Sequence, residues 1–143
     1  MKQVRVASSV DAGTLWQVVS DVTAWPDLVP TFTSVALVDG RPGERAGDRY
    51  RVVQPGLPPA VYEVTQWLRG HSFTWVARSP GLTTTAHHEI TETPTGAALE
   101  LTLAWSGALA PLVRALVGHR AGRLIAGEAA AMVAEAERRV RGA

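Results

Sequence analysis

The 143-residue sequence contains no cysteine, which excludes disulfide bonds and thiolate metal ligands. No apolar run approaches the roughly 20 residues that a membrane-spanning helix needs. Met1 to Val4 lead directly into an alternating strand pattern, which leaves no room for the apolar core of a signal peptide. From these absences we expect a cytoplasmic protein with no membrane span.

The net charge is only +1, so the composition has no electrostatic signature of a nucleic-acid or anionic-membrane partner. The glycine-containing stretches "GERAG" and "GHRAG" do not follow a strand in the phosphate-binding pattern. His87 and His88 are neighbours on one strand and point to opposite faces, while His71 and His119 have no ligand spacing. We therefore expect no metal site and no cofactor.

What the chain does contain is an ordinary globular composition, with 46% hydrophobic and 19% charged residues. A chain of this length buries roughly 68–70% of its unfolded surface, which is enough for a proper core. The pattern has no repeat, linker or low-complexity tract. We therefore expect residues 1–143 to form a single ligand-binding domain.

The stretch "VVSDVTAWPDLVPTF", residues 18 to 32, predicts a bend between two short helices. Ser9 or Asp11 can cap the first helix, and Asp21 ends it. Proline is tolerated in a first helical turn, so Trp25-Pro26 opens the second helix and Pro30 closes it. Trp16 and Trp25 are the expected structural anchors of the bend.

Alternating segments separated by glycine and proline turns predict one strand before this bend and six after it. Residues 109–141 then show helical periodicity, with a kink or break expected near Gly118 and Gly122. The predicted fold class is α+β: a curved seven-stranded antiparallel sheet around a long C-terminal helix, with two short helices after strand one.

Period-two alternation assigns one face of each strand to the interior and places Trp67 outside or at an edge. The inward set is apolar and aromatic with a few polar tips, which suits a hydrophobic ligand site and equally suits an ordinary core. The residues predicted to line such a cavity are Phe32, Tyr50, Tyr62, Val64, Gln66, Trp75, Thr84, His88, Leu103, Trp105 and Leu116.

Individual polar residues leave the chemistry open. His88 could act as a general acid or base, but no carboxylate shares its predicted face, which favours a satisfied core histidine. Tyr50 and Tyr62 could donate to a ligand carbonyl or to the backbone. Arg120 and Arg123 could reach the cavity mouth, although solvated helix-face charges are commoner. No catalytic residue is assigned.

The series Trp16, Asp21, Trp25-Pro26 and Pro30 resembles the first-helix pattern of the START-related polyketide cyclase/dehydrase (SRPBCC) superfamily. Further similarities are "GDRYRV", "YEVTQW", "SFTWVA" and "SGALAPL", so that the resemblance covers essentially the whole chain. It implies the helix-grip fold, also found in a plant pollen allergen family. It further implies a hydrophobic ligand held between the sheet and the long helix.

The resemblance to the aromatase/cyclases of this superfamily has gaps. The positions at which those enzymes carry inward Ser and Arg groups fall on Gln66 and Leu68, and the inward aromatic before them is Val64. The expected tyrosine after the second helix falls on Phe32, which has no hydroxyl. These differences argue against the established cyclase chemistry.

Three functions remain. The first is binding of a hydrophobic, aromatic or polycyclic small molecule. The second is a polyketide cyclase, aromatase or dehydratase activity that works by positioning the substrate. The third is a non-enzymatic interaction module whose cavity is filled by its own aromatics, which an exposed Trp67 patch would favour. The sequence leaves monomer and homodimer open.

Overall fold

The computed structural model describes residues 1–39 and 46–142. Its elements are β1 (Lys2–Ser8), α1 (Ala12–Ser20), the 3-10 turn η1 (Val22–Ala24), α2 (Trp25–Leu28), β2 (Ser34–Asp39), β3 (Arg49–Val53), β4 (Ala60–Leu68), β5 (Ser72–Ser79), β6 (Leu82–Thr93), β7 (Gly96–Ser106) and α3 (Ala110–Arg141). This order confirms the predicted fold class. The turn predicted between β2 and β3 lies mostly outside the described residues.

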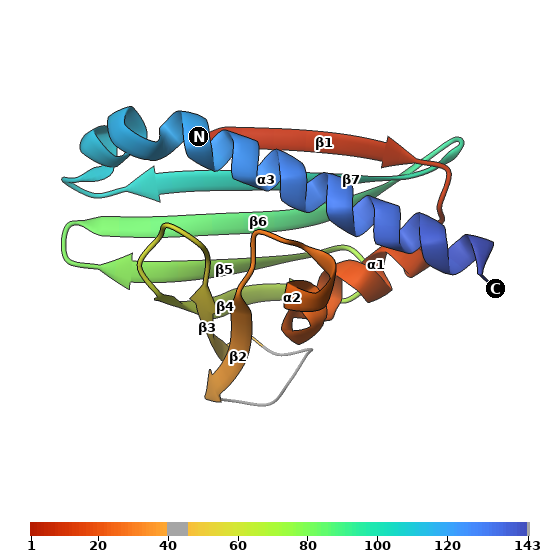
Figure 1. Ribbon diagram of the computed structural model, residues 1–143, viewed down its shortest axis with the longest axis horizontal. Helices are drawn as coiled ribbons and strands as arrows, with labels where there is room; N and C mark the ends of the chain where they lie inside the picture. The colour runs from red at the N-terminus through yellow and green to blue at the C-terminus, as the bar shows by residue number, and fades with distance from the viewer. Residues whose placement is uncertain (40–45, 143) are drawn as a thin grey trace.

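The seven strands form one antiparallel sheet in the order β1-β7-β6-β5-β4-β3-β2. Figure 1 shows α3 running across one face of this sheet, with α1 and α2 on the same side. Helix α1 contacts α3, β6 and β7. No helix within the described residues is long and apolar enough to cross a membrane.

The bend after β1 is built as predicted. Asp11 caps α1 by accepting a hydrogen bond from the Thr14 amide at 3.0 Å. Helix α1 ends at Asp21, and Pro26 lies in the first turn of α2. Trp25 is fully buried, and its ring lies 5.4 Å from that of Trp75. The bend therefore seats Trp25 on the concave face of the sheet.

A β-bulge in β4 reverses which side chains point inward in the second half of this strand, so the predicted orientation there is wrong. Val64 pairs with Trp75 and Gln66 pairs with Thr74, so Thr65 is the extra residue. One extra residue reverses the alternation that follows it. Gln66 is therefore exposed, and Trp67 lies inward with its ring 5.3 Å from that of Trp16.

Helix α3 continues from Ala110 to Arg141, so a break near Gly118 and Gly122 is wrong, while the alternative of a kink there stays a prediction. Both glycines lie against the Lys2 side chain, where a Cβ would contact its carbons at 3.4 and 3.6 Å. These are ordinary van der Waals distances, so the contact of α3 with β1 does not require glycine at either position.

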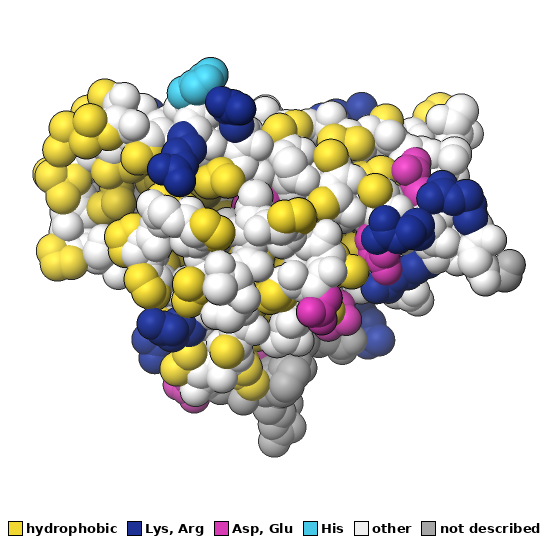
Figure 2. All heavy atoms as spheres, in the orientation of Figure 1, with side chains coloured by type: hydrophobic (Ala, Val, Ile, Leu, Met, Phe, Trp, Pro, Cys, Tyr) yellow, Lys and Arg dark blue, Asp and Glu magenta, His cyan; other side chains and the backbone are white. Residues whose placement is uncertain are grey.

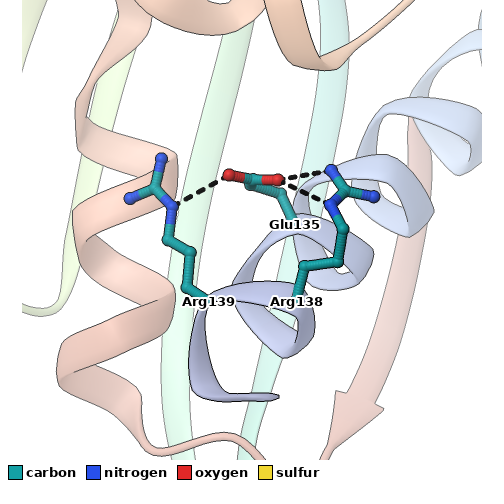
Figure 3. Close-up of polar contacts among 3 residues, drawn as sticks. All are labelled: Glu135, Arg138 and Arg139. Carbon is teal, nitrogen blue, oxygen red and sulfur yellow. Dashed lines mark hydrogen bonds and ion pairs between the residues drawn. The ribbon is translucent and has the colours of Figure 1, made fainter. Parts of the chain in front are cut away.

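The last turns of α3 carry ion-paired side chains (Figure 3). Glu135 accepts hydrogen bonds from Arg138 and Arg139, the latter at 3.0 Å. These bonds, with that from Arg139 foremost, hold the pKa of Glu135 below its usual value.

Buried side chains form two clusters. The larger surrounds Trp25, Phe73 and Met132 where α1, α2 and the second half of α3 meet the sheet. The smaller contains Trp105, Ala110 and Ala121 near the start of α3. The space between the two clusters is where the candidate site lies.

Candidate functional site

A cavity of about 760 Å³ lies between the sheet and α3. Its wall includes Trp25 and Trp75 of the large cluster and Trp105 and Ala121 of the small one. Ligand cavities of globular proteins typically measure about 300–1,000 Å³ and have mostly apolar walls. The aromatic side chains therefore leave a hollow large enough for a small molecule.

Part of the predicted set lies in this wall: Phe32, Tyr62, Trp75, Thr84, His88, Leu103 and Trp105. Alternation along regular strands positions most of them, because β5, β6 and β7 pair without a register shift. Contact of any of them with a ligand stays a prediction.

Four predicted residues do not line the cavity. Tyr50 and Val64 are buried in the closed core, with the Tyr50 ring 6.0 Å from that of Trp75. Gln66 is turned outward by the bulge in β4. Leu116 is 73% exposed, because Val113 and Val117 are the residues of those helical turns that line the cavity.

Among the cavity residues that the sequence analysis missed, Glu128 on α3 is the one with a strongly shifted pKa. Only 7% of it is exposed, and its Oε1 accepts a hydrogen bond from Nε2 of Gln54 at 3.1 Å. Burial raises the pKa of Glu128 to about 7, and the bond from Gln54 opposes this shift. The carboxyl group therefore exchanges its proton near neutral pH.

Tyr62 lies in the same part of the wall. Burial, followed by the nearby charge of Glu128, raises the pKa of Tyr62 to about 12. The phenol thus stays protonated and can donate a hydrogen bond. The Tyr62 ring also packs against Trp75, with centroids 5.0 Å apart.

His88 is buried in the aromatic cluster and stacks on Phe73 with ring centroids 4.2 Å apart. Its Nδ1 donates to the Phe73 carbonyl at 3.4 Å. Burial lowers the pKa of His88 to about 3, outweighing this hydrogen bond. His88 is therefore a neutral imidazole, as expected of a core histidine, and its Nδ1–H tautomer leaves Nε2 as an acceptor.

Two further polar groups belong to the wall. The buried indole nitrogen of Trp25 has no hydrogen-bond partner among the described residues, and a donor of this kind usually finds one. The Arg120 guanidinium lies directly over Gly56 and leaves no room there for a Cβ. Arg120 and the Gln54–Glu128 hydrogen bond thus tie the β3–β4 loop to α3 beside the cavity.

Among residues 1–39 and 46–142, no group of three His, Asp or Glu side chains is arranged to hold a metal ion. The ionisable groups described above are instead dispersed around an apolar wall. This arrangement can orient a largely apolar molecule through the Glu128 carboxyl group and the Tyr62 phenol.

Comparison with solved structures identifies the same fold in proteins of low sequence identity. The di-domain aromatase/cyclase StfQ of the steffimycin pathway aligns with a TM-score of 0.75 and 13% identity over 96% of this chain and 50% of that one. The ZhuI aromatase/cyclase from Streptomyces sp. R1128 aligns with a TM-score of 0.70 and 16% identity over 96% of this chain and 93% of that one. A protein from Thermus thermophilus aligns with a TM-score of 0.77 and 12% identity over 96% of this chain and 97% of that one.

The chain thus spans half the length of the two-domain StfQ. No curated protein sequence matches it significantly. The family model described as "Polyketide cyclase / dehydrase and lipid transport" matches residues 2–141. Together with the helix-grip architecture and its cavity, this match shows that the chain belongs to the polyketide cyclase/dehydrase family.

Proposed function

We propose that this protein binds a hydrophobic, aromatic or polycyclic small molecule in the cavity between the sheet and α3. The cavity itself carries the proposal, because its wall is mostly apolar, contains several aromatic rings and also holds polar side chains that can orient a ligand. Stacking on Trp75 and Tyr62 favours a planar ligand. Glu128 and Tyr62 favour a ligand with a hydroxyl or carbonyl group at one end.

Native mass spectrometry tests the proposal. The protein is incubated separately with fatty acids, sterols, flavonoids and aromatic polyketides, and a discrete adduct is expected with one aromatic class. Three tryptophans in the wall, Trp25, Trp75 and Trp105, provide an independent readout through ligand-dependent fluorescence quenching. An unchanged mass and unchanged fluorescence across the panel would contradict the proposal.

A second candidate is a cyclase- or dehydratase-like activity, and Glu128 is the observation that favours it. A carboxyl group with a pKa of about 7 can both accept and return a proton at neutral pH, as cyclisation followed by dehydration requires. The gaps noted above remain, since the inward residue after the β4 bulge is Trp67 rather than a polar group.

This candidate is tested with a linear poly-β-ketone thioester, and loss of water is followed by mass spectrometry. Glu128→Gln should lower turnover at least tenfold and flatten the pH profile near 7, while the substrate affinity is retained. Equal turnover in the parent and the variant would remove Glu128 from the chemistry. The interaction-module hypothesis loses its main support, because Trp67 packs on Trp16 and Phe73.

A further inference from the structure

The start of α3 exposes large apolar side chains on its outer face. Leu109, Leu112 and Leu116 are 44%, 55% and 73% exposed. Figure 2 shows hydrophobic side chains gathered at the end of the molecule where α3 begins. We name the surface of these three leucines the leucine face. Val113 and Val117, which directly follow Leu112 and Leu116 in sequence, line the cavity, so the leucine face lies directly outside the cavity wall.

Charge around the leucine face has one sign. The bordering segments 1–3, 54–59, 79–81 and 106–127 contain no Asp or Glu. Each of the first three contacts the last: Lys2 lies against Gly118, Gly56 against Arg120, and the Leu109 amide bonds to the Gly81 carbonyl. The cations of this region are Lys2, Arg114, Arg120 and Arg123.

The other half of α3 differs, because residues 128–141 contain three Glu beside three Arg, and Glu135 pairs with Arg138 and Arg139 (Figure 3). The net charge of +1 therefore conceals a local concentration of positive charge at one end. Exposed leucines flanked only by cations suit the interface of an anionic lipid bilayer, where apolar side chains enter the headgroup region.

We propose that the leucine face docks on anionic lipid surfaces, an interaction that goes beyond ligand binding in the cavity. A second copy of the chain fits less well, because a two-fold interface would bring the same cations face to face. A partner protein would need a groove for side chains that protrude as far as Leu116 does. A bilayer accepts such side chains without a preformed groove.

Vesicle flotation tests the proposal. Vesicles of phosphatidylcholine with 30% phosphatidylglycerol should bind the protein, and vesicles of phosphatidylcholine alone should bind it at least tenfold less. Raising NaCl to 0.5 M should weaken binding, because salt screens the cations. Leu112→Glu combined with Leu116→Glu should lower the partition coefficient more than about tenfold. Arg123→Gln should lower it about fivefold.

Leu68→Glu is the matched control, because Leu68 is 49% exposed at the end of β4, away from α3. It should bind vesicles as the parent does. Circular dichroism and binding of N-phenyl-1-naphthylamine without vesicles monitor folding and the cavity separately. Equal binding to both vesicle types, no binding, or full binding by the double leucine variant would overturn the proposal. A dimer in sedimentation that this variant dissociates would also overturn it.

Discussion

Glu128 is a buried carboxyl group whose pKa is raised to about 7. A carboxyl group on an Ala-rich helix is usually solvated, but this one is buried beside the cavity and accepts a hydrogen bond from Gln54. Its raised pKa means that the folded state binds the proton more tightly than the unfolded chain does. Burial of the ionised form therefore costs stability.

The cost has a definite pH dependence. As pH rises from the usual value of 4.5 to about 7, the unfolded state releases the proton first, so this group lowers the free energy of unfolding. Glu128→Gln should be as stable as the parent near pH 4.5 and more stable at pH 8, by at most about 3 kcal/mol. Urea unfolding at both pH values measures the difference. A difference in the free energy of unfolding between variant and parent that does not change with pH would contradict the raised pKa.

His88 has the opposite dependence. Its folded-state pKa of about 3 lies below the usual 6.5, so stability is lost as pH falls below 6.5. The loss between pH 7 and pH 5 should be about 2 kcal/mol from this group. His88→Phe keeps the stack on Phe73 and should remove that part of the pH dependence. A variant with the same acid sensitivity as the parent would show that His88 is not the cause.

These residues mark what sequence reasoning can and cannot reach. The inward side of His88 was predictable because β6 alternates regularly and Ile90 fixes its inward face. Glu128 was missed because its residue type suggested solvent, and only the tertiary structure places it against Gln54 and Tyr62. Leu116 was misplaced because apolar residues occupy more than one face of the first half of α3. Periodicity alone does not select the face that meets the sheet.

At the scale of elements, the β4 bulge has the largest consequence. It turns Gln66 to solvent and packs Trp67 between Trp16 and Phe73, with ring centroids at 5.3 and 5.2 Å. An inserted residue of ordinary type leaves no mark in an alternating pattern. The inward preference of a tryptophan was the one available signal, because it conflicted with strict alternation.

Neighbouring substitutions test this orientation. Trp67→Ala should lower the free energy of unfolding by about 2–4 kcal/mol, because it empties a packed aromatic contact. Gln66→Ala, one residue earlier, should change it by no more than about 0.5 kcal/mol. Thermal and urea unfolding of both variants give the comparison. The reverse ranking would restore the regular strand register.

The order of the elements was predictable for physical reasons that act locally. Proline and glycine positions delimit the strands, and Pro26 and Asp21 set the bend between α1 and α2. The predicted break in α3 failed because a helical glycine costs only about 1 kcal/mol relative to alanine, and α3 packs against β1 and β7. Helix propensity carries no information about such packing.

At the scale of the whole molecule, the two buried clusters leave the cavity between them unfilled. Close packing throughout would stabilise the fold further, since empty volume forfeits dispersion contacts. The proposed ligand site therefore predicts that filling the hollow would stabilise the fold and weaken ligand binding. Ala121 is a suitable position to test this opposition, because it lies on α3 in the cavity wall and is buried.

Ala121→Phe should fill part of the cavity from the helix side. We expect N-phenyl-1-naphthylamine to bind at least tenfold more weakly, while the melting temperature stays equal to that of the parent or rises. Ala126→Phe, on the exposed side of α3, is the matched control and should leave probe affinity unchanged. Weakened binding in both variants would point to a general disturbance of α3. Unchanged binding in Ala121→Phe would place the probe outside the cavity and remove the basis of the proposed function.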